Sequence, residues 1–187
     1  MVKFISMKKY LLIIKVLVIV LFSFSCESNF VESNVKMVLT GSVHGQLDPC
    51  GWKKNPLGGL SRKYVAIKEM RDVDQDPIVL DAGDMFFSTT SLNKNNLESE
   101  KYRCETMLSG YEKIGCDGLN IGKYELLAGL SYLKTLEEKY PKVPFISANI
   151  RDKKTQELIF SPYRILKKDN LSIGIIGVTN MVPDTME

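Results

Sequence analysis

Three short segments of the chain carry the side chains that could perform chemistry: residues 40–47, 80–84 and 121–125. The first contains His44, the only histidine of the sequence, and the second contains Asp84. Imidazole nitrogens and carboxylate oxygens are common ligands of divalent metal ions in proteins. These residue types therefore indicate a metal site. The alternative is ordinary loop chemistry, because an aspartate that follows a strand commonly accepts hydrogen bonds from neighbouring backbone N–H groups.

The residue order in these segments resembles the metal-binding motifs of the calcineurin-like metallophosphoesterases, in particular those of the secreted 5'-nucleotidase and UDP-sugar hydrolase family. That family carries Asp-x-His, then Gly-Asp, then Gly-Asn-His-Glu at the ends of successive strands. This chain reads Thr-Gly-Ser-Val-His-Gly-Gln-Leu, Leu-Asp-Ala-Gly-Asp and Ile-Gly-Lys-Tyr-Glu in the same order. The resemblance extends over residues 36–185 and includes the sequences at 57–62, 146–150 and 173–179.

The resemblance implies a two-metal site of which two positions remain. In the family, the aspartate and histidine of the first motif bind one metal, the second-motif aspartate bridges both metals, and the asparagine binds the other. His44 and Asp84 occupy the histidine and bridging positions. Ser42, Lys123 and Tyr124 replace the first aspartate, the asparagine and the last histidine. A serine is a weak ligand, a lysine repels a bound cation, and a phenol does not replace an imidazole. We therefore expect a degenerate site that holds one divalent ion (Mn, Zn or Mg) or none.

The resemblance leads to two expectations about function. A phosphoesterase of this kind uses two ions about 3.5–4 Å apart to activate a hydroxide and stabilise the phosphoryl oxygens. Because most of the ligands are replaced, we expect a 5'-nucleotidase-like fold that is not a working nucleotidase. The alternative is a metal-dependent phosphoester hydrolase that acts on nucleotides, as the family does in nucleotide catabolism. The sequence alone does not decide whether the chain is an enzyme.

A cysteine in the loop after the first motif indicates different chemistry. The sequence Asp-Pro-Cys-Gly around Cys50, with Gly-Gly-Leu-Ser-Arg at 58–62, resembles a branch of the family that has degenerate metal motifs and a Pro-Cys-Gly-Cys sequence. Trp52 stands where that branch has its second cysteine. Two lysines follow Cys50 closely and would favour its thiolate, so thiol or redox chemistry is a second alternative function. Otherwise Cys50 is a disulfide partner or an inert thiol, and the sequence does not reveal any pairing.

Residues 1–25 have the pattern of a signal peptide, with lysines ahead of an apolar core at 16–24. This core is too short to span a membrane, which takes about 20 apolar residues. It is followed by a sequence that resembles a lipobox, so we expect Cys26 to be the lipidated first mature residue. Residues 26–34 would then tether a domain at 35–187 to membrane lipid, in the periplasm or on the surface of a bacterium. An ordinary signal peptide or an uncleaved anchor is the alternative.

The charge balance gives no electrostatic reason to expect nucleic-acid binding. The chain has 25 basic and 22 acidic residues, a net charge of +3. Four of the 25 basic residues, and none of the acidic ones, precede Cys26, which leaves 21 basic against 22 acidic residues. We therefore expect no nucleic-acid partner. With 44% hydrophobic and 25% charged residues, the composition is that of an ordinary globular protein.

Alternating strands and helices must position the candidate side chains. Short apolar runs predict strands, and apolar residues at helical spacing predict the helices between them. The predicted strands are 35–39, 78–80, 119–121 and 145–150, the predicted helices are 60–71, 97–114 and 126–140, and a hairpin is predicted from 159–166 and 171–178. This alternation is typical of an α/β protein. The family resemblance implies a metallophosphoesterase-type four-layer α/β/β/α sandwich, which we expect to be incomplete at the C-terminus.

Overall fold

The computed structural model describes residue 15, residues 34–51, residue 54, residues 56–73 and residues 76–180. From Asn34 onward the described residues lie within one compact unit of the chain. Apart from residue 15, the predicted signal peptide lies outside the described residues, as do Cys26 and most of the predicted tether. In the part that the structure describes, no helix has the length and apolar character needed to cross a membrane.

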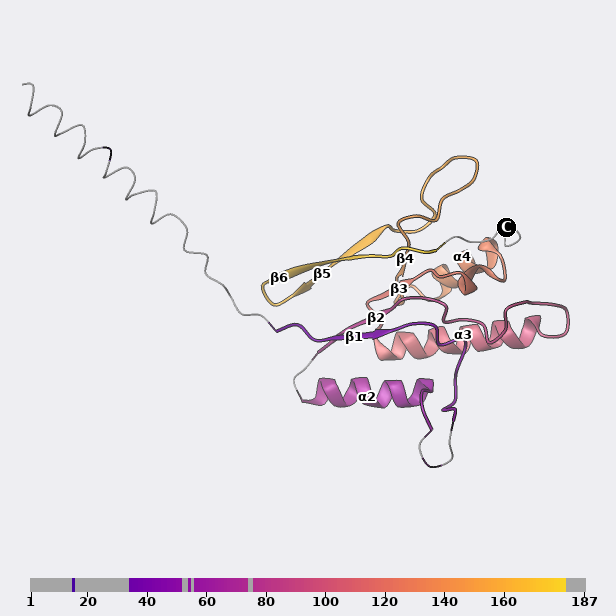
Figure 1. The fold of residues 1–187 in the computed structure, drawn as a ribbon, viewed down its shortest axis with the longest axis horizontal. Coiled ribbons are helices and arrows are strands. Elements are labelled where there is room, and N and C mark those ends of the chain that lie inside the picture. Colours follow the sequence, from indigo (N-terminus) through magenta and orange to yellow (C-terminus); the bar gives the residue numbers. More distant parts are fainter. Residues whose placement is uncertain (1–14, 16–33, 52–53, 55, 74–75, 181–187) are drawn as a thin grey trace, which may run out of the picture. The chain divides into compact units, whose positions relative to one another are not determined.

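A parallel sheet organises the compact unit (Figure 1). Its strands are hydrogen-bonded in chain order: β1 Met37–Thr40, β2 Ile78–Asp81, β3 Gly118–Asn120 and β4 Phe145–Ile146. The register pairs Thr40 with Asp81, and Asp81 with Leu119. Because the strands are parallel and nearly in step, the segments that follow β1, β2 and β3 leave the same edge of the sheet. These are the three segments whose side chains indicate chemistry.

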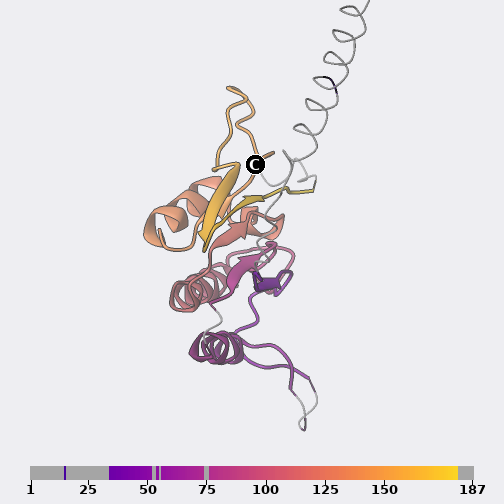
Figure 2. The ribbon, with the colours of Figure 1, turned by 90° about the vertical axis from the view of Figure 1, so that its left-hand side faces the viewer.

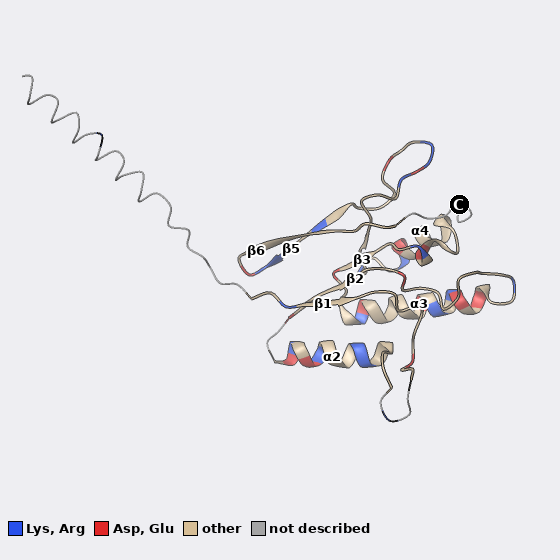
Figure 3. Ribbon diagram, viewed as in Figure 1, with Lys and Arg blue, Asp and Glu red and all other residues tan. Residues whose placement is uncertain are grey.

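The helices that connect the strands lie on one side of this sheet (Figure 2). They are α2 Leu60–Asp72, α3 Leu97–Ile114 and α4 Leu130–Lys139. Right-handed crossovers between strands that follow one another in the sheet place every connecting helix on the same face. The core between helices and sheet is aromatic and aliphatic, and includes Phe86, Phe87, Met107, Leu108, Tyr111, Leu119 and Leu133. Acidic and basic residues are interspersed along the helices (Figure 3).

The helix predicted at 126–140 is shorter than expected. The α-helix begins at Leu130, and residues Tyr124–Leu126 form a separate short 3-10 helix, η1. Gly129 lies between them with φ of 85°, a left-handed conformation that a continuous helix does not accommodate. The leucine spacing across the interruption suits a helix, but this backbone conformation separates the two pieces.

The fourth strand is also shorter than the predicted range of 145–150. It ends at Ile146, because the backbone beyond it bonds to later parts of the chain. Ser147 N–H donates to Ser161 O at 3.0 Å, and Ala148 N–H donates to Gly177 O at 2.7 Å. These bonds draw the chain out of the parallel sheet towards the C-terminal hairpin.

The predicted hairpin is confirmed, with antiparallel strands β5 Tyr163–Lys168 and β6 Leu171–Ile176. Its bounds differ from the predicted 159–166 and 171–178, because the first strand begins later and continues to Lys168, and the second ends at Ile176. Asp169 in the connecting turn has φ of 51°, a conformation that aspartate tolerates better than most residues. The α/β class is confirmed as well. The described residues provide one helix layer, the parallel sheet and this hairpin as parts of the predicted sandwich.

Candidate functional site

The first two motif segments run side by side beyond the strands. Ser42 N–H donates to Gly83 O at 2.8 Å, His44 N–H to Asp84 O at 3.1 Å, and Gly45 N–H to Met85 O at 2.7 Å. These bonds continue the pairing of β1 with β2 past the end of the sheet. They bring His44 and Asp84, the two predicted metal ligands, onto adjacent stretches of backbone.

Both segments contain left-handed backbone at residues other than glycine. Ser42, His44 and Asp84 have φ of 52°, 44° and 55°. This region costs a residue with a Cβ atom about 1–2 kcal/mol. Such conformations concentrate at functional sites, where the surrounding structure holds them. Here the bonds between the two segments hold the backbone in place.

The third segment packs against the other two through Tyr124. Its N–H donates to Asp84 Oδ1 at 2.9 Å. Its ring meets the His44 ring edge-on, with centroids 4.6 Å apart and an interplanar angle of 67°. Lys123 is exposed to solvent. The structure therefore brings His44, Asp84 and Tyr124 together, with Ser42 beside them on the first segment.

Glu125 has a role that the sequence reasoning did not assign. Its carboxylate accepts the N–H groups of Asp84 at 2.9 Å, Met85 at 2.6 Å and Gly122 at 2.8 Å. Burial raises the pKa of the Glu125 carboxyl to about 7, although these donors act to lower it. Glu125 thus joins the second segment to the third. The signal that could have identified it is the glutamate that ends the family's third motif.

Asp81 is buried and its carboxylate accepts hydrogen bonds from neighbouring parts of the chain. Its Oδ1 accepts Gly83 N–H at 2.9 Å, which is the local bonding expected of an aspartate after a strand. Its Oδ2 accepts the hydroxyls of Thr40 at 2.5 Å and Tyr111 at 2.6 Å. Lys63 Nζ lies 3.6 Å from the same oxygen. Burial lowers the pKa of Lys63, opposed by the neighbouring Asp81 carboxylate. This network fixes the start of the first two segments to α2 and α3.

The available donors do not fit a two-metal centre. Within the described ranges, no group of three or more His, Cys, Asp and Glu side chains is placed to hold a metal ion. Asp81 is directed into the network below the site, and Asp84 Oδ1 already accepts a backbone N–H. His44 is the only imidazole of the sequence. Two ions would therefore lack ligands among these residues.

Cys50 lies on the neighbouring loop and is exposed. It lines a cavity of about 490 Å³ together with His44 and Arg103. Cys104 and Cys116 are buried, and burial raises the pKa of both thiols, that of Cys116 to about 12. None of these three cysteines forms a disulfide within the part of the chain that the structure describes. The candidate thiol therefore differs from the other two in being accessible.

Comparison with known proteins identifies relatives of part of the chain. No family model matches it. It is 34% identical over 97 residues to Protein UshA of Salmonella pullorum, which is 52% of this chain and 18% of that protein. It is 30% identical over 145 residues to a 5'-nucleotidase of Vibrio parahaemolyticus, which is 75% of this chain and 24% of that protein.

Solved structures share its fold. A 5'-nucleotidase precursor from Thermus thermophilus matches with a TM-score of 0.65 at 23% identity, over 78% of this chain and 28% of that one. The calcineurin-like phosphoesterase YfkN from Bacillus subtilis matches with a TM-score of 0.59 at 20% identity, over 78% of this chain and 48% of that one.

The chain belongs to the 5'-nucleotidase family. The matched region is a minor part of the two sequence relatives, 18% and 24% of their lengths. Membership in the 5'-nucleotidase family confirms the resemblance predicted from the three motifs. The Pro-Cys-Gly branch within that family stays a prediction.

Proposed function

We propose that this chain is an exported, lipid-anchored protein that keeps the 5'-nucleotidase-like fold, has a degenerate two-metal site and does not act as a nucleotidase. The observation that carries this proposal is the position of Tyr124. Its ring packs against His44 and its N–H binds Asp84, so it contacts both retained family positions. A neutral phenol is a poor substitute for the imidazole that the family has there.

The alternative is a metal-dependent phosphoester hydrolase that acts on nucleotides. It is favoured by family membership and by the adjacent backbone positions of His44 and Asp84. In this case one divalent ion (Mn, Zn or Mg) would be held by these two side chains and water. A site with one ion would lack the second metal of a two-metal site. The two metals together stabilise the attacking and leaving oxygens of the reaction.

Metal content and phosphate release distinguish the two functions. We expect the purified chain, after exposure to manganese or zinc, to bind at most one ion and to release no phosphate from nucleotides. The matched variant restores the family residues through Ser42→Asp, Lys123→Asn and Tyr124→His, and is expected to bind more metal. Two ions per wild-type chain, together with metal-dependent phosphate release, would contradict the proposal.

The lipid anchor is tested separately at Cys26. The sequence after the apolar core supports lipidation of this residue. We expect the wild-type chain to fractionate with membranes, and mass spectrometry of its N-terminal peptide to show a diacylglyceryl group on Cys26. The Cys26→Ser variant should lack this modification. An unmodified Cys26 in a wild-type chain that is cleaved elsewhere would indicate an ordinary signal peptide.

A further inference from the structure

The hairpin of β5 and β6 has an outer face whose centre is apolar. Tyr163 and Ile176 pair across the two strands, and Ile165 lies on the same face, two residues further along β5. All three side chains are more than half exposed. The last pair on this face is Lys167 with Ser172, and both strands, which the structure describes completely, carry no acidic residue on it. A tyrosine among aliphatic side chains, with a lysine at the border, suits the headgroup region of a membrane.

The inner face of the hairpin is held by the rest of the protein. Arg164 Nη1 donates to Asp117 O at 3.0 Å, and Lys168 forms an ion pair with Asp76. Successive side chains of a strand point to opposite faces, so Arg164 and Lys168 alternate with the outer-face residues of β5. These contacts therefore fix which face of the hairpin points outward.

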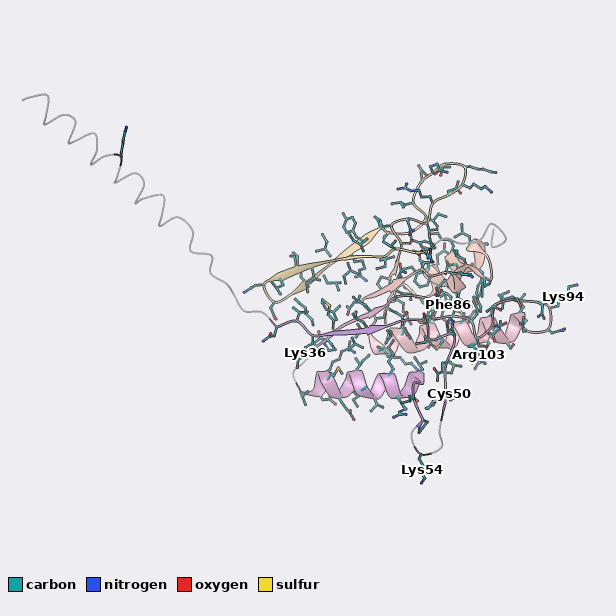
Figure 4. All side chains as sticks on the ribbon, viewed as in Figure 1. Lys36, Cys50, Lys54, Phe86, Lys94 and Arg103 are labelled. Atoms are coloured by element: carbon teal, nitrogen blue, oxygen red, sulfur yellow. The ribbon has the colours of Figure 1, made fainter. Side chains whose placement is uncertain are left out.

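The turn of the hairpin lies at the end of the parallel sheet where the chain enters it. Lys168 binds Asp76, which comes two residues before Ile78 at the start of β2. Ile78 N–H donates to Lys36 O at 2.9 Å, and Lys36 immediately precedes β1. Figure 4 shows Lys36 at this end of the sheet, with Cys50 towards the other end. The hairpin turn and the point where a tether would join are thus at the same end of the strands.

The excess positive charge of residues 34–180 lies in the region of the hairpin. Residues 151–180 contain six basic and three acidic residues, whereas residues 34–150 contain fifteen of each. The loop at 151–157 contributes three of these basic residues and projects on the hairpin's side of the sheet (Figures 1 and 2). An anionic lipid surface attracts basic side chains within about a Debye length. It complements this charge, whereas a second copy of the chain would bring the same positive excess.

The proposed tether is short enough to hold the outer face near lipid. This step rests on the proposed function, in which Cys26 carries the lipid. Asn34 is eight residues after Cys26, and eight extended residues span at most about 29 Å. The six-residue strands of the hairpin are each about 20 Å long. Because the hairpin turn is at the end where the tether joins, the tether confines the outer face to the neighbourhood of the bilayer.

We propose that the outer face of the hairpin docks on the anionic lipid surface to which the chain is tethered. The side chains of Tyr163, Ile165 and Ile176 enter the headgroup region, while Lys167 and the basic residues of the 151–157 loop meet lipid phosphates. The candidate functional site lies beyond the opposite ends of the parallel strands and is not part of this surface. Docking therefore orients the molecule on the membrane and leaves the candidate site uncovered.

Footprinting of the full wild-type chain with a water-soluble carbene reagent tests this contact. The protein is placed in vesicles of phosphatidylcholine alone, or of phosphatidylcholine and phosphatidylglycerol in equal amounts, and peptide mass mapping measures the labelling. We expect labelling of Tyr163, Ile165 and Ile176 to fall several-fold on the anionic vesicles and to change little on the neutral ones. Tyr102 of α3 is also largely exposed, and it should be labelled equally on both as the internal reference.

Charge variants separate lipid from protein as the occupant of this face. Lys167→Gln should lower the ratio of docked to undocked chains about fivefold, the effect of one basic side chain near an anionic surface. Lys68→Gln changes an exposed lysine of α2 and should leave the ratio unchanged. Equal hairpin labelling on neutral and anionic vesicles would overturn the proposal. Protection that follows the protein-to-lipid ratio instead of the lipid charge would assign the face to a second copy and would also overturn it.

The same samples separate membrane docking of the hairpin from the lipid anchor. The mass of the N-terminal peptide shows whether Cys26 carries a diacylglyceryl group, and the hairpin labelling is read independently of that result. An unprotected hairpin on a lipidated chain overturns the docking and leaves the anchor standing. A chain without the lipid is footprinted with anionic vesicles in excess, where protection of the hairpin supports the docking and its absence overturns it.

Discussion

At the scale of single residues, the candidate site depends on the carboxylate of Glu125, which binds the backbone of the site. Glu125 accepts three backbone N–H groups from two segments and is fully enclosed, with 1% of its surface exposed. A buried carboxylate with several donors is stabilised in its charged form by those donors and destabilised by loss of water. Here the loss of water dominates, and the pKa of Glu125 is raised to about 7. The connection between the second and third segments therefore responds to pH.

We expect Glu125 to make the protein less stable as pH rises from about 4.5 to 7. Its pKa in the folded state is raised above the usual 4.5, so the folded state keeps a proton that the unfolded state has lost. The contribution is fully present below about pH 4.5 and is lost as pH rises through about 7. The shift corresponds to a decrease of up to about 3 kcal/mol in the free energy of unfolding. Urea unfolding at a series of pH values measures it.

A comparison of two variants isolates the effect of this carboxyl from that of other groups. Glu125→Gln removes the titrating proton and should flatten this part of the pH dependence, while lowering stability because an amide oxygen satisfies fewer N–H groups. Glu157→Gln changes an exposed glutamate and should keep the wild-type slope. A slope that persists unchanged in Glu125→Gln would show that another group is responsible.

The sequence predicted which residue types would gather here, but not how they bond. His44, Asp84 and Tyr124 were expected together from motif order, and the structure places them in contact. The bonds from Glu125 to the Asp84 segment and from Lys63 to Tyr111 join residues separated by 41 and 48 positions. Contacts at such separations follow from the packing of strands and helices, which no local pattern specifies.

At the scale of elements, α2 and α3 approach closely because α3 has a glycine at the contact. A Cβ atom placed on Gly110 would lie 2.3 Å from Leu60 Cδ2, well inside van der Waals contact. Leu60 begins α2 and packs against the core. The short distance matters for the site, since α2 carries Lys63 and α3 carries Arg103 and Tyr111.

We expect Gly110→Ala to destabilise the protein by about 1–3 kcal/mol, the usual cost of overpacking. On helix propensity alone the same change would stabilise α3 by about 1 kcal/mol. In a Leu60→Ala background the clash is absent, so Gly110→Ala should be neutral or stabilising there. Urea unfolding of the four proteins gives the coupling energy between the two positions. Additive effects would mean that the two side chains do not compete for the same space.

The elements themselves were largely predictable where local signals agree. The predicted helix at 97–114 matches α3 at both ends. Its C-terminal end is set by Gly115, which adopts a left-handed conformation with φ of 76° and stops the helix. The helix predicted at 126–140 begins late because Gly129 also adopts positive φ inside an otherwise suitable apolar pattern. A glycine permits such a turn without requiring it, so its effect depends on what surrounds it.

At the scale of the whole molecule, the hairpin presents an apolar outer face. Tyr163, Ile165, Ile176 and Val178 are 56%, 61%, 67% and 66% exposed. Tyr163 and Ile176 are paired across the two strands, so their side chains lie on the same face of the ribbon. Contiguous exposed apolar surface of this kind is uncommon on monomeric soluble proteins and favours association.

We expect the purified chain to associate as its concentration rises, because contact between such faces removes apolar surface from water. Sedimentation velocity at protein concentrations from roughly 0.1 to 10 μM, a hundredfold range, measures the association. Ile165→Thr with Ile176→Thr keeps residues that suit a strand while making the face polar, and should weaken association by about tenfold or more. Val73→Thr alters an equally accessible apolar side chain, 65% exposed at the end of α2, and should leave association unchanged. If the wild-type chain sediments as a monomer throughout, the outer face of the hairpin does not mediate association of this chain.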